Sequence, residues 1–306
     1  MKRELVADAG VLLIAAIWGF AFVVVKSSLD HIPAAYMLAF RFTIASLAFI
    51  IIFFKKLKGI NRTTLIRGAV TGIFLFTAYL SQTYGCNYTT AGKNAFITAF
   101  YTIMVPFINY MIFRKKPDMF ALAAAPIAMA GIGLLSLNGE GGLNIGDILT
   151  FVCSFLFAFQ IVFIDHYVEM GEDPVLLAIL QVIVSAILSC ITAPFLEGPF
   201  PMEVFAPDMI RGMLYLGLLS TMVCELLQNI CQKYTHPTSC AVLMSMESVF
   251  GMLSSVVFLN EIVSLKMFIG CVIMFIAVII VTVKPFGNRL TGHKIKNDEN
   301  LRGGDL

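Results

Sequence analysis

The sequence has little charge. Only 13% of its 306 residues are Asp, Glu, Lys or Arg, about half the share that soluble domains carry, and this scarcity excludes an ordinary water-soluble globule. Neither sign of charge dominates, with 21 Lys and Arg against 19 Asp and Glu. This balance gives no indication of nucleic acid as a partner.

Motifs for catalysis or metal binding are also missing. The sequence has no glycine-rich phosphate loop and no zinc-protease helix motif, so ATP hydrolysis within this chain is excluded. Its seven cysteines lie in apolar runs and form no CxxC pair, which argues against a metal site or a disulfide framework. A membrane-embedded, lipid-modifying enzyme would need His, Asp or Glu clustered at a membrane interface. The four scattered histidines leave it only a remote alternative.

Long hydrophobic runs are abundant instead, and 59% of the residues are apolar. Ten segments are long enough to cross about 30 Å of hydrocarbon as helices, and their continuous apolar character excludes the alternating pattern of a β-barrel. We therefore predict an all-α integral membrane protein with ten transmembrane helices. The predicted spans are approximately residues 9–26, 34–54, 66–86, 93–113, 119–137, 147–166, 174–195, 211–231, 239–259 and 264–284.

The positively charged residues predict the orientation. With a cytoplasmic N-terminus, the inner segments hold sixteen Lys and Arg and the outer segments four, so we expect both termini to be cytoplasmic. The first span is too long for a signal-peptide core, and we expect it to be retained. One inner connection departs from the rule, because residues 165–173 carry four acidic residues and no Lys or Arg. We expect a multi-pass protein of the bacterial plasma (inner) membrane.

The two halves of the chain resemble each other. Residues 66–68 (Ile-Arg-Gly) recur as residues 210–212, an offset of 144, and further on an offset of 146 matches Gln82 with Gln228. The region around Trp18 aligns with the sixth span at an offset near 139. Because each copy contains an odd number of spans, the second copy must enter the membrane from the opposite side, as in many secondary transporters.

This repeat defines the predicted domain organisation as two inverted five-helix repeats and a tail. We expect the tail to be a disordered cytoplasmic end. The three predicted parts are a first repeat over residues 1–138, a second repeat over residues 139–284 and the tail over residues 285–306.

Four segments occur in a characteristic order: Ile17-Trp18-Gly19-Phe20, then Arg41, then residues 90–107, and finally residues 246–261. In this order they resemble the drug/metabolite transporter superfamily, specifically its EamA-type ten-helix members. The resemblance covers residues 9–284. It implies a secondary carrier with a central cavity between two five-helix halves, opened alternately to each side and frequently exporting small metabolites. It implies no cofactor.

Ionisable side chains within the predicted spans are functional candidates, because a charge at the bilayer centre costs about 2.5–3.5 kcal/mol. Glu247 lies near the middle of its span, where it can couple protons or bind an amine; the alternative is a permanently protonated group that joins helices. Gly251, one turn later, would let a substrate or a neighbouring helix approach closely. Arg41 either forms a structural ion pair with Glu225 or Glu247, or binds a substrate carboxylate.

Glu225 begins a polar stripe that continues with Gln228, Asn229 and Gln232 at helical spacing. Lipid cannot satisfy these groups, so they must face the protein interior or a wet cavity. They line the substrate path or join helices, and the sequence leaves both readings open. Gln82, the repeat partner of Gln228, supports a symmetric cavity.

Further candidates for the cavity lining are aromatic or amide side chains, although aromatic residues in an apolar chain usually serve packing. Lys93, near the outer end of its span, is expected to reach water as a solvated charge. The further candidates are Trp18, Tyr79, Tyr101 and Gln160.

These observations predict a secondary active transporter, not an enzyme, that moves a small amphipathic metabolite such as an amino acid or an amine. Proton-coupled export is the first hypothesis. An uptake carrier of the same fold for a vitamin or nucleobase-like compound is the alternative, because alternating access runs in either direction. The expected partners are a small-molecule substrate, the lipid bilayer and protons. The sequence leaves the substrate, the coupling ion and the choice between monomer and homodimer open.

Overall fold

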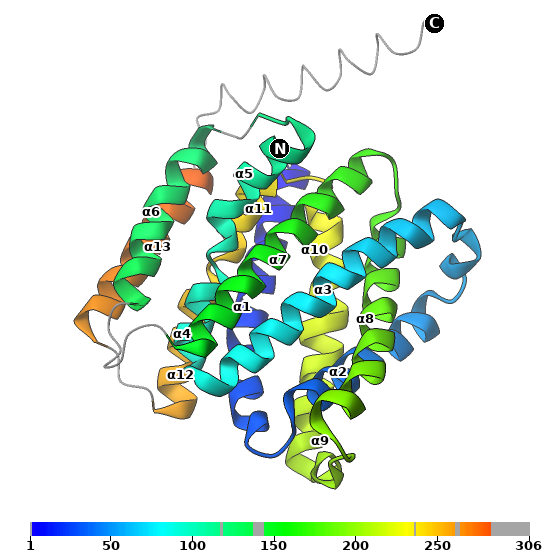
Figure 1. The fold of residues 1–306 in the computed structure, drawn as a ribbon. Helices are drawn as coiled ribbons and strands as arrows, with labels where there is room; N and C mark the ends of the chain where they lie inside the picture. Colours follow the sequence, from blue (N-terminus) through cyan, green and yellow to red (C-terminus); the bar gives the residue numbers. More distant parts are fainter. Residues whose placement is uncertain (1, 117–118, 137–143, 236, 261–263, 283–306) are drawn as a thin grey trace, which may run out of the picture.

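The computed structural model describes residues 2–116, 119–136, 144–235, 237–260 and 264–282. The predicted tail over residues 285–306 lies outside them. Within the described residues every element is helical (Figure 1). The elements are α1 (Lys2–Leu29), α2 (Ala34–Phe53), η1 (Lys56–Gly59), α3 (Arg62–Tyr88), α4 (Ala91–Thr98), α5 (Tyr101–Phe113), α6 (Met119–Ser136), α7 (Ile145–Glu169), α8 (Pro174–Glu197), η2 (Met202–Phe205), α9 (Pro207–Leu214), η3 (Tyr215–Val223), α10 (Cys224–Gln232), α11 (Pro237–Met244), α12 (Glu247–Leu259) and α13 (Leu265–Thr282).

Eight helical stretches of the described chain are long and apolar enough to cross a membrane. Shorter apolar stretches at Leu122–Gly131 and Phe268–Ala277 belong to α6 and α13. Large apolar side chains such as Phe195 and Ile51 remain mostly exposed, which suits a surface that faces lipid tails and not water. The all-helical membrane class is therefore confirmed, whereas the count of ten spans stays a prediction.

The helices of the two sequence halves interlock. Helix α3 packs along α7 and α8, α2 along α8, and α1 along α12, while α6 and α13 lie side by side at one edge (Figure 1). Each of these contacts joins one helix from the first half to one from the second. The core is therefore shared between the halves, and a cavity inside it must be lined by both.

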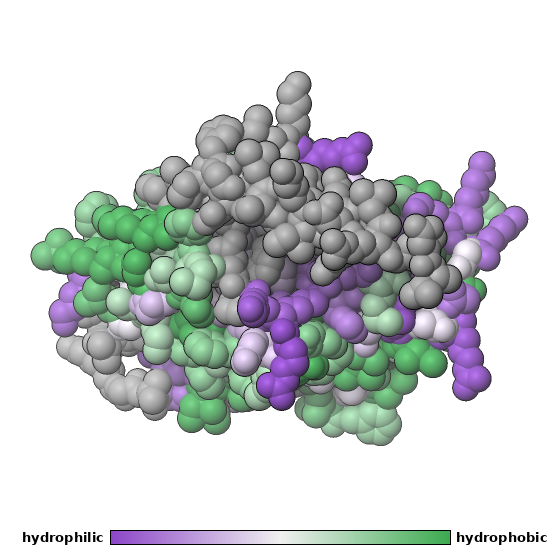
Figure 2. All heavy atoms as spheres, turned by 90° about the horizontal axis from the view of Figure 1, so that it is seen from above, coloured by the Kyte–Doolittle hydropathy of each residue, from purple (hydrophilic) through white to green (hydrophobic). Residues whose placement is uncertain are grey.

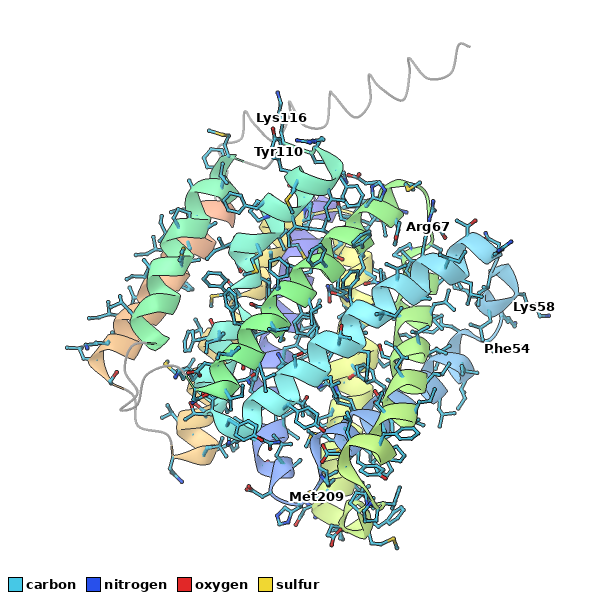
Figure 3. The ribbon with its side chains drawn as sticks, in the orientation of Figure 1. Phe54, Lys58, Arg67, Tyr110, Lys116 and Met209 are labelled. Carbon is cyan, nitrogen blue, oxygen red and sulfur yellow. The ribbon has the colours of Figure 1, made fainter. Side chains whose placement is uncertain are left out.

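Charged side chains gather at one end of the bundle, which we call the basic end (residues 54–67, 114–116 and 165–173). Figure 2, the view from above, shows hydrophilic residues near the middle and at the right, and hydrophobic residues at the left and along the lower edge. In Figure 3, Lys58, Arg67 and Lys116 lie towards this end and Met209 lies at the far side. We call the far side the opposite end (residues 26–34, 84–93, 144–147 and 197–208).

Ion pairs at the basic end explain why the connection over residues 165–173 can be acidic although it departs from the orientation rule. Arg67 Nη1 lies 2.7 Å from Glu172 Oε1, and Lys115 Nζ lies 2.9 Å from Asp165 Oδ2. Lys115 also pairs with Glu169, and Lys56 with Asp173. Residues 165–173 therefore lie on the same side as the neighbouring connections. The Lys and Arg side chains of those connections neutralise the four acidic residues.

The opposite end is held by a buried pair that the sequence did not indicate. Lys93 Nζ lies 2.6 Å from Oδ2 of Asp147, whose side chain is fully buried. Asp147 also forms a capping box with Asn144 at the start of α7, and Thr89 donates to it. The expectation of a solvated Lys93 is wrong, because the amine replaces water with a carboxylate from the other half of the chain.

Candidate functional site

A cavity lies between the two halves, and about 530 Å³ of space that no atom fills, part of it open to solvent, lies among its lining residues. Its polar lining comes from α1, α2, α3, α4, α5, α7, α10 and α12, so it sits where the helices of both halves meet. The lining residues are Trp18, Ala21, Phe22, Val25, Arg41, Tyr79, Gln82, Cys86, Asn94, Tyr101, Phe157, Gln160, Ile161, Gln228, Met244 and Glu247.

Two breaks in the helices shape the middle of the cavity. Between α4 and α5, Phe100 N donates to Ile97 O and Thr102 N to Ala99 O. Between α11 and α12, Met246 N donates to Leu243 O and Ser248 N to Ser245 O. These tight i→i−3 turns recur at the repeat offset of the later spans, and each places a polar residue, Tyr101 or Glu247, at the start of the following helix.

Glu247 is buried, yet its Oε1 has no hydrogen-bond partner among the described residues. Helix α1 crosses α12 beside it, because a Cβ at Gly19 would lie 2.7 Å from Gly251 N and 2.9 Å from Glu247 O. The expected close approach at Gly251 is confirmed, and the approaching element is a helix. The close crossing fixes the backbone of α12 at Glu247, whose side chain lines the cavity together with that of Tyr101.

Arg41 is held by neutral groups from both halves. Its Nε donates to Thr221 Oγ1 at 2.5 Å, and its Nη2 donates to Ser220 Oγ at 3.0 Å and to Tyr79 OH at 3.3 Å. Ser220 and Thr221 belong to η3, a π-helical stretch, and π-helical turns often occur at functional sites. None of the ion pairs among the described residues involves Arg41. The expected direct ion pair with Glu225 or Glu247 is therefore wrong.

Glu225 lies directly behind the cavity wall. Tyr79 OH donates to its Oε1 at 3.4 Å, and Gln181 Nε2 and Gln160 Nε2 donate to its Oε2 at 3.0 and 3.4 Å. Gln181 also donates to Asn229 at 3.4 Å. Tyr79 thus links the guanidinium of Arg41 to the Glu225 carboxyl, and the wall between cavity and carboxyl is one side chain thick.

Two comparisons with known proteins bear on what this arrangement does. The model of the EamA-like transporter family matches residues 5–137 and 144–283. The chain belongs to the EamA-like transporter family. An uncharacterized transporter of Archaeoglobus fulgidus is 35% identical over 282 residues, covering 92% of this chain and 87% of the relative. A probable amino-acid metabolite efflux pump of Escherichia coli is 26% identical over 278 residues, covering 86% and 90%.

A solved crystal structure shares the fold of this EamA-like transporter. Its TM-score is 0.72 at 16% sequence identity, with 90% of this chain and 97% of the other covered. The family match and the relative of Archaeoglobus fulgidus confirm the predicted family resemblance. The chain is a multi-pass membrane transporter and not an enzyme, which removes the lipid-modifying alternative.

The cavity of this EamA-like transporter gathers eight of the ten residues that sequence reasoning selected. Two of the ten, Glu225 and Asn229, lie behind the wall, and Asn229 donates to Pro174 O at 3.3 Å. Sequence reasoning missed Asn94, Phe22, Cys86 and Met244. Asn94 carried a signal, because an amide within an apolar span must also face the interior.

Proposed function

We propose that this EamA-like transporter is a proton-coupled secondary carrier that exports a small amphipathic metabolite, such as an amino acid or an amine. The observation that carries the proposal is the buried Glu247 oxygen, which has no hydrogen-bond partner among the described residues and lines the cavity between the halves. A carboxyl in this position can hold a proton or a solute N–H, and exchanging one for the other couples the two. The names of the E. coli and Salmonella typhimurium relatives, amino-acid metabolite efflux pumps, favour export.

The proposed architecture is ten spans in two oppositely inserted five-span halves, with both termini in the cytoplasm of a bacterium and the chain in its plasma (inner) membrane. The excess of Lys and Arg at the basic end supports this orientation. The recurrence of the helix breaks at the offset that also relates Gln82 to Gln228 supports the repeat. Movement of one half against the other then opens the cavity to alternate sides.

The proposal is tested with Glu247→Gln in proteoliposomes. The amide keeps the size of the side chain and cannot release a proton, so uphill transport driven by a proton gradient should fall at least about a hundredfold. Exchange of solute without a gradient should persist. Glu203→Gln, at an exposed position in η2, is the matched control and should transport as the parent does.

Gradient-driven transport at the parent rate by Glu247→Gln would contradict the coupling role. Flux measured separately in inside-out and right-side-out vesicles decides between export and uptake. Accumulation of solute driven by an inward proton gradient only in the uptake direction would reject export.

A further inference from the structure

The cavity is built largely from residues that are repeat counterparts of one another. At offsets of 139 on α1 and α7, and 146 on the later helices, both members of five pairs line it. The repeat therefore places the centre of the cavity on the symmetry element between the halves. The five pairs are Trp18 with Phe157, Ala21 with Gln160, Phe22 with Ile161, Gln82 with Gln228, and Tyr101 with Glu247.

Two glycine contacts fix the counterpart of Arg41. A Cβ at Gly72 would meet Gln181 O at 2.8 Å and Val184 Cβ at 2.7 Å. A Cβ at Gly217 would meet Arg41 O at 3.1 Å and Ile44 Cγ2 at 2.7 Å. The two contacts are equivalent: Gly72 faces Gln181 and Val184 of α8, and Gly217 faces Arg41 and Ile44 of α2. Gln181 lies 140 positions after Arg41, and Val184 lies 140 positions after Ile44. Gln181 is therefore the counterpart of Arg41.

Six lining residues have no counterpart in the lining, and five of these come from the first half. They lie in the middle of the bundle or towards the opposite end, whereas the basic end is tied by ion pairs. The present structure thus extends the cavity away from the basic end. The six are Val25, Arg41, Tyr79, Cys86, Asn94 and Met244, and their counterparts, all buried, are Ile164, Gln181, Glu225, Gln232, Cys240 and Thr98.

When two inverted halves exchange their conformations, each residue takes the surroundings that its counterpart has now. The cavity that faces the basic end would then keep Glu247 and Tyr101, which form a pair. It would lose Arg41 and Tyr79 and gain Gln181 and Glu225. The charged lining changes from one cation and one carboxyl to two carboxyls.

Four buried polar atoms of the present cavity lack a hydrogen-bond partner among the described residues: the Tyr101 hydroxyl, which can donate, and three acceptor oxygens. Asn94 Nδ2 donates to Gln82 O and to Thr150 Oγ1, which leaves Asn94 Oδ1 without a partner. Gln228 Nε2 donates to Gln160 Oε1, which leaves Gln228 Oε1 without a partner. With Glu247 Oε1 they form three acceptors that need donors, and an ammonium group supplies three N–H donors.

We propose that the solute is an organic cation with an apolar body, bound between Glu247 and Glu225 when the cavity faces the basic end. Its release follows when Arg41 replaces Glu225 in the lining. The aromatic and aliphatic lining around Trp18, Phe157 and Ile161 accommodates the apolar body. This inference rests on the proposed function, because it assumes that the two halves exchange conformations.

The test uses single-cysteine chains in sealed vesicles of known orientation. One retains Cys86 alone, and the other carries Gln232→Cys as its one thiol. A small membrane-impermeant methanethiosulfonate should modify Cys86 from the opposite end and the Gln232→Cys chain from the basic end. A chain that retains Cys224 alone is the control, because neither Cys224 nor its counterpart Ala78 lines the cavity in either arrangement.

Phenethylammonium and 3-phenylpropionate serve as probes, since they share a ring and a two-carbon chain and differ in charge. Phenethylammonium should slow modification of both thiols at least about fivefold, and 3-phenylpropionate should not. Glu225→Gln should weaken the protection by phenethylammonium about tenfold in the Gln232→Cys chain. Its effect in the Cys86 chain should be smaller, because Glu225 then lies behind the wall.

The outcomes separate this inference from the proposed function. If both thiols react from their expected sides and 3-phenylpropionate protects at least as well, the carrier stands and the cationic solute is rejected. If the Gln232→Cys chain reacts from neither side while the parent still transports with a proton gradient, the exchanged lining is rejected. The proposed proton coupling then remains intact. Reaction of both thiols from one side only would overturn alternating access and this inference with it.

Discussion

Equivalent positions in the two halves carry different chemistry on the same backbone. Tyr79 of α3 corresponds to Glu225 of α10, and Tyr101 of α5 corresponds to Glu247 of α12, both pairs at the same repeat offset. In both pairs the first half supplies a phenol and the second half a carboxyl. A duplicated scaffold therefore fixes where polar groups lie, while the individual side chains decide which half holds protons or cations.

The largest expected effect comes from removing one member of the Tyr79 and Glu225 pair. Glu225→Leu removes the acceptor of the Tyr79 hydroxyl, one acceptor each of Gln160 and Gln181, and the carboxyl linked to Arg41, so it should destabilise the protein by about 3–5 kcal/mol. Tyr79→Phe removes one hydroxyl and should cost about 1–2 kcal/mol. Unfolding in detergent measures both. Equal losses would mean that the two positions contribute alike.

The glycine contacts test whether the halves pack equivalently. Alanine at Gly72 or at Gly217 would meet atoms at 2.7–2.8 Å, so each substitution should cost about 1–3 kcal/mol in unfolding free energy. Gly133→Ala in α6 is the control, because no atom of the described residues lies within 4 Å of its added Cβ, and it should be neutral or slightly stabilising. A loss at only one of the two crossings would show that the packing is not shared.

The helix ends offer a smaller comparison. Arg114 ends α5 with φ 56°, and Asn260, its repeat counterpart, ends α12 with φ 54°. Glycine relieves the left-handed conformation, so Arg114→Gly should raise the unfolding free energy by about 1 kcal/mol. Asn260→Gly should gain less, because asparagine tolerates this conformation. The reverse order in the same unfolding assay would contradict this account.

The weakest expected effect concerns the ion pair of Lys56 with Asp173, which joins the two halves. Burial alone would raise the pKa of Asp173, but hydrogen bonds from Lys56 and the start of α8 outweigh it and hold the pKa below its ordinary value. A lowered pKa stabilises the folded state at neutral pH and loses that contribution as the pH falls below about 4. The pair is partly exposed, so the loss should be about 0–1 kcal/mol. Asp173→Asn should flatten this part of the stability profile, and an unchanged profile would show that the ion pair contributes nothing.

The sequence predicted the membrane class, the family resemblance and half of the cavity lining. These features depend on hydrophobic run length and on polar groups that lipid cannot satisfy, and both are local properties. The polar stripe from Glu225 to Gln232 is an example: all its members are buried.

Features that depend on contacts between distant helices were missed. The break at Ala99 and Phe100 contains no glycine or proline, and the proline that follows it, Pro106, lies inside α5. The buried pair of Lys93 with Asp147 joins residues 54 positions apart. Tyr79 and Gln160 both line the cavity and donate to the Glu225 carboxyl behind it, and a helical pattern does not specify these contacts.

The π-helical stretch Tyr215–Val223 explains why the offset between the halves grows from 144 to 146 across this region. Its wide turns absorb two additional residues, which an α-helix could accommodate only by rotating everything downstream by about 200°. Glu225 would then point into the lipid. The same turns present Ser220 and Thr221 to Arg41 and offer Ser220 O to the Trp18 indole. Two additional residues in this stretch thus form a binding site for the Arg41 guanidinium and leave the Glu225 carboxyl facing the interior.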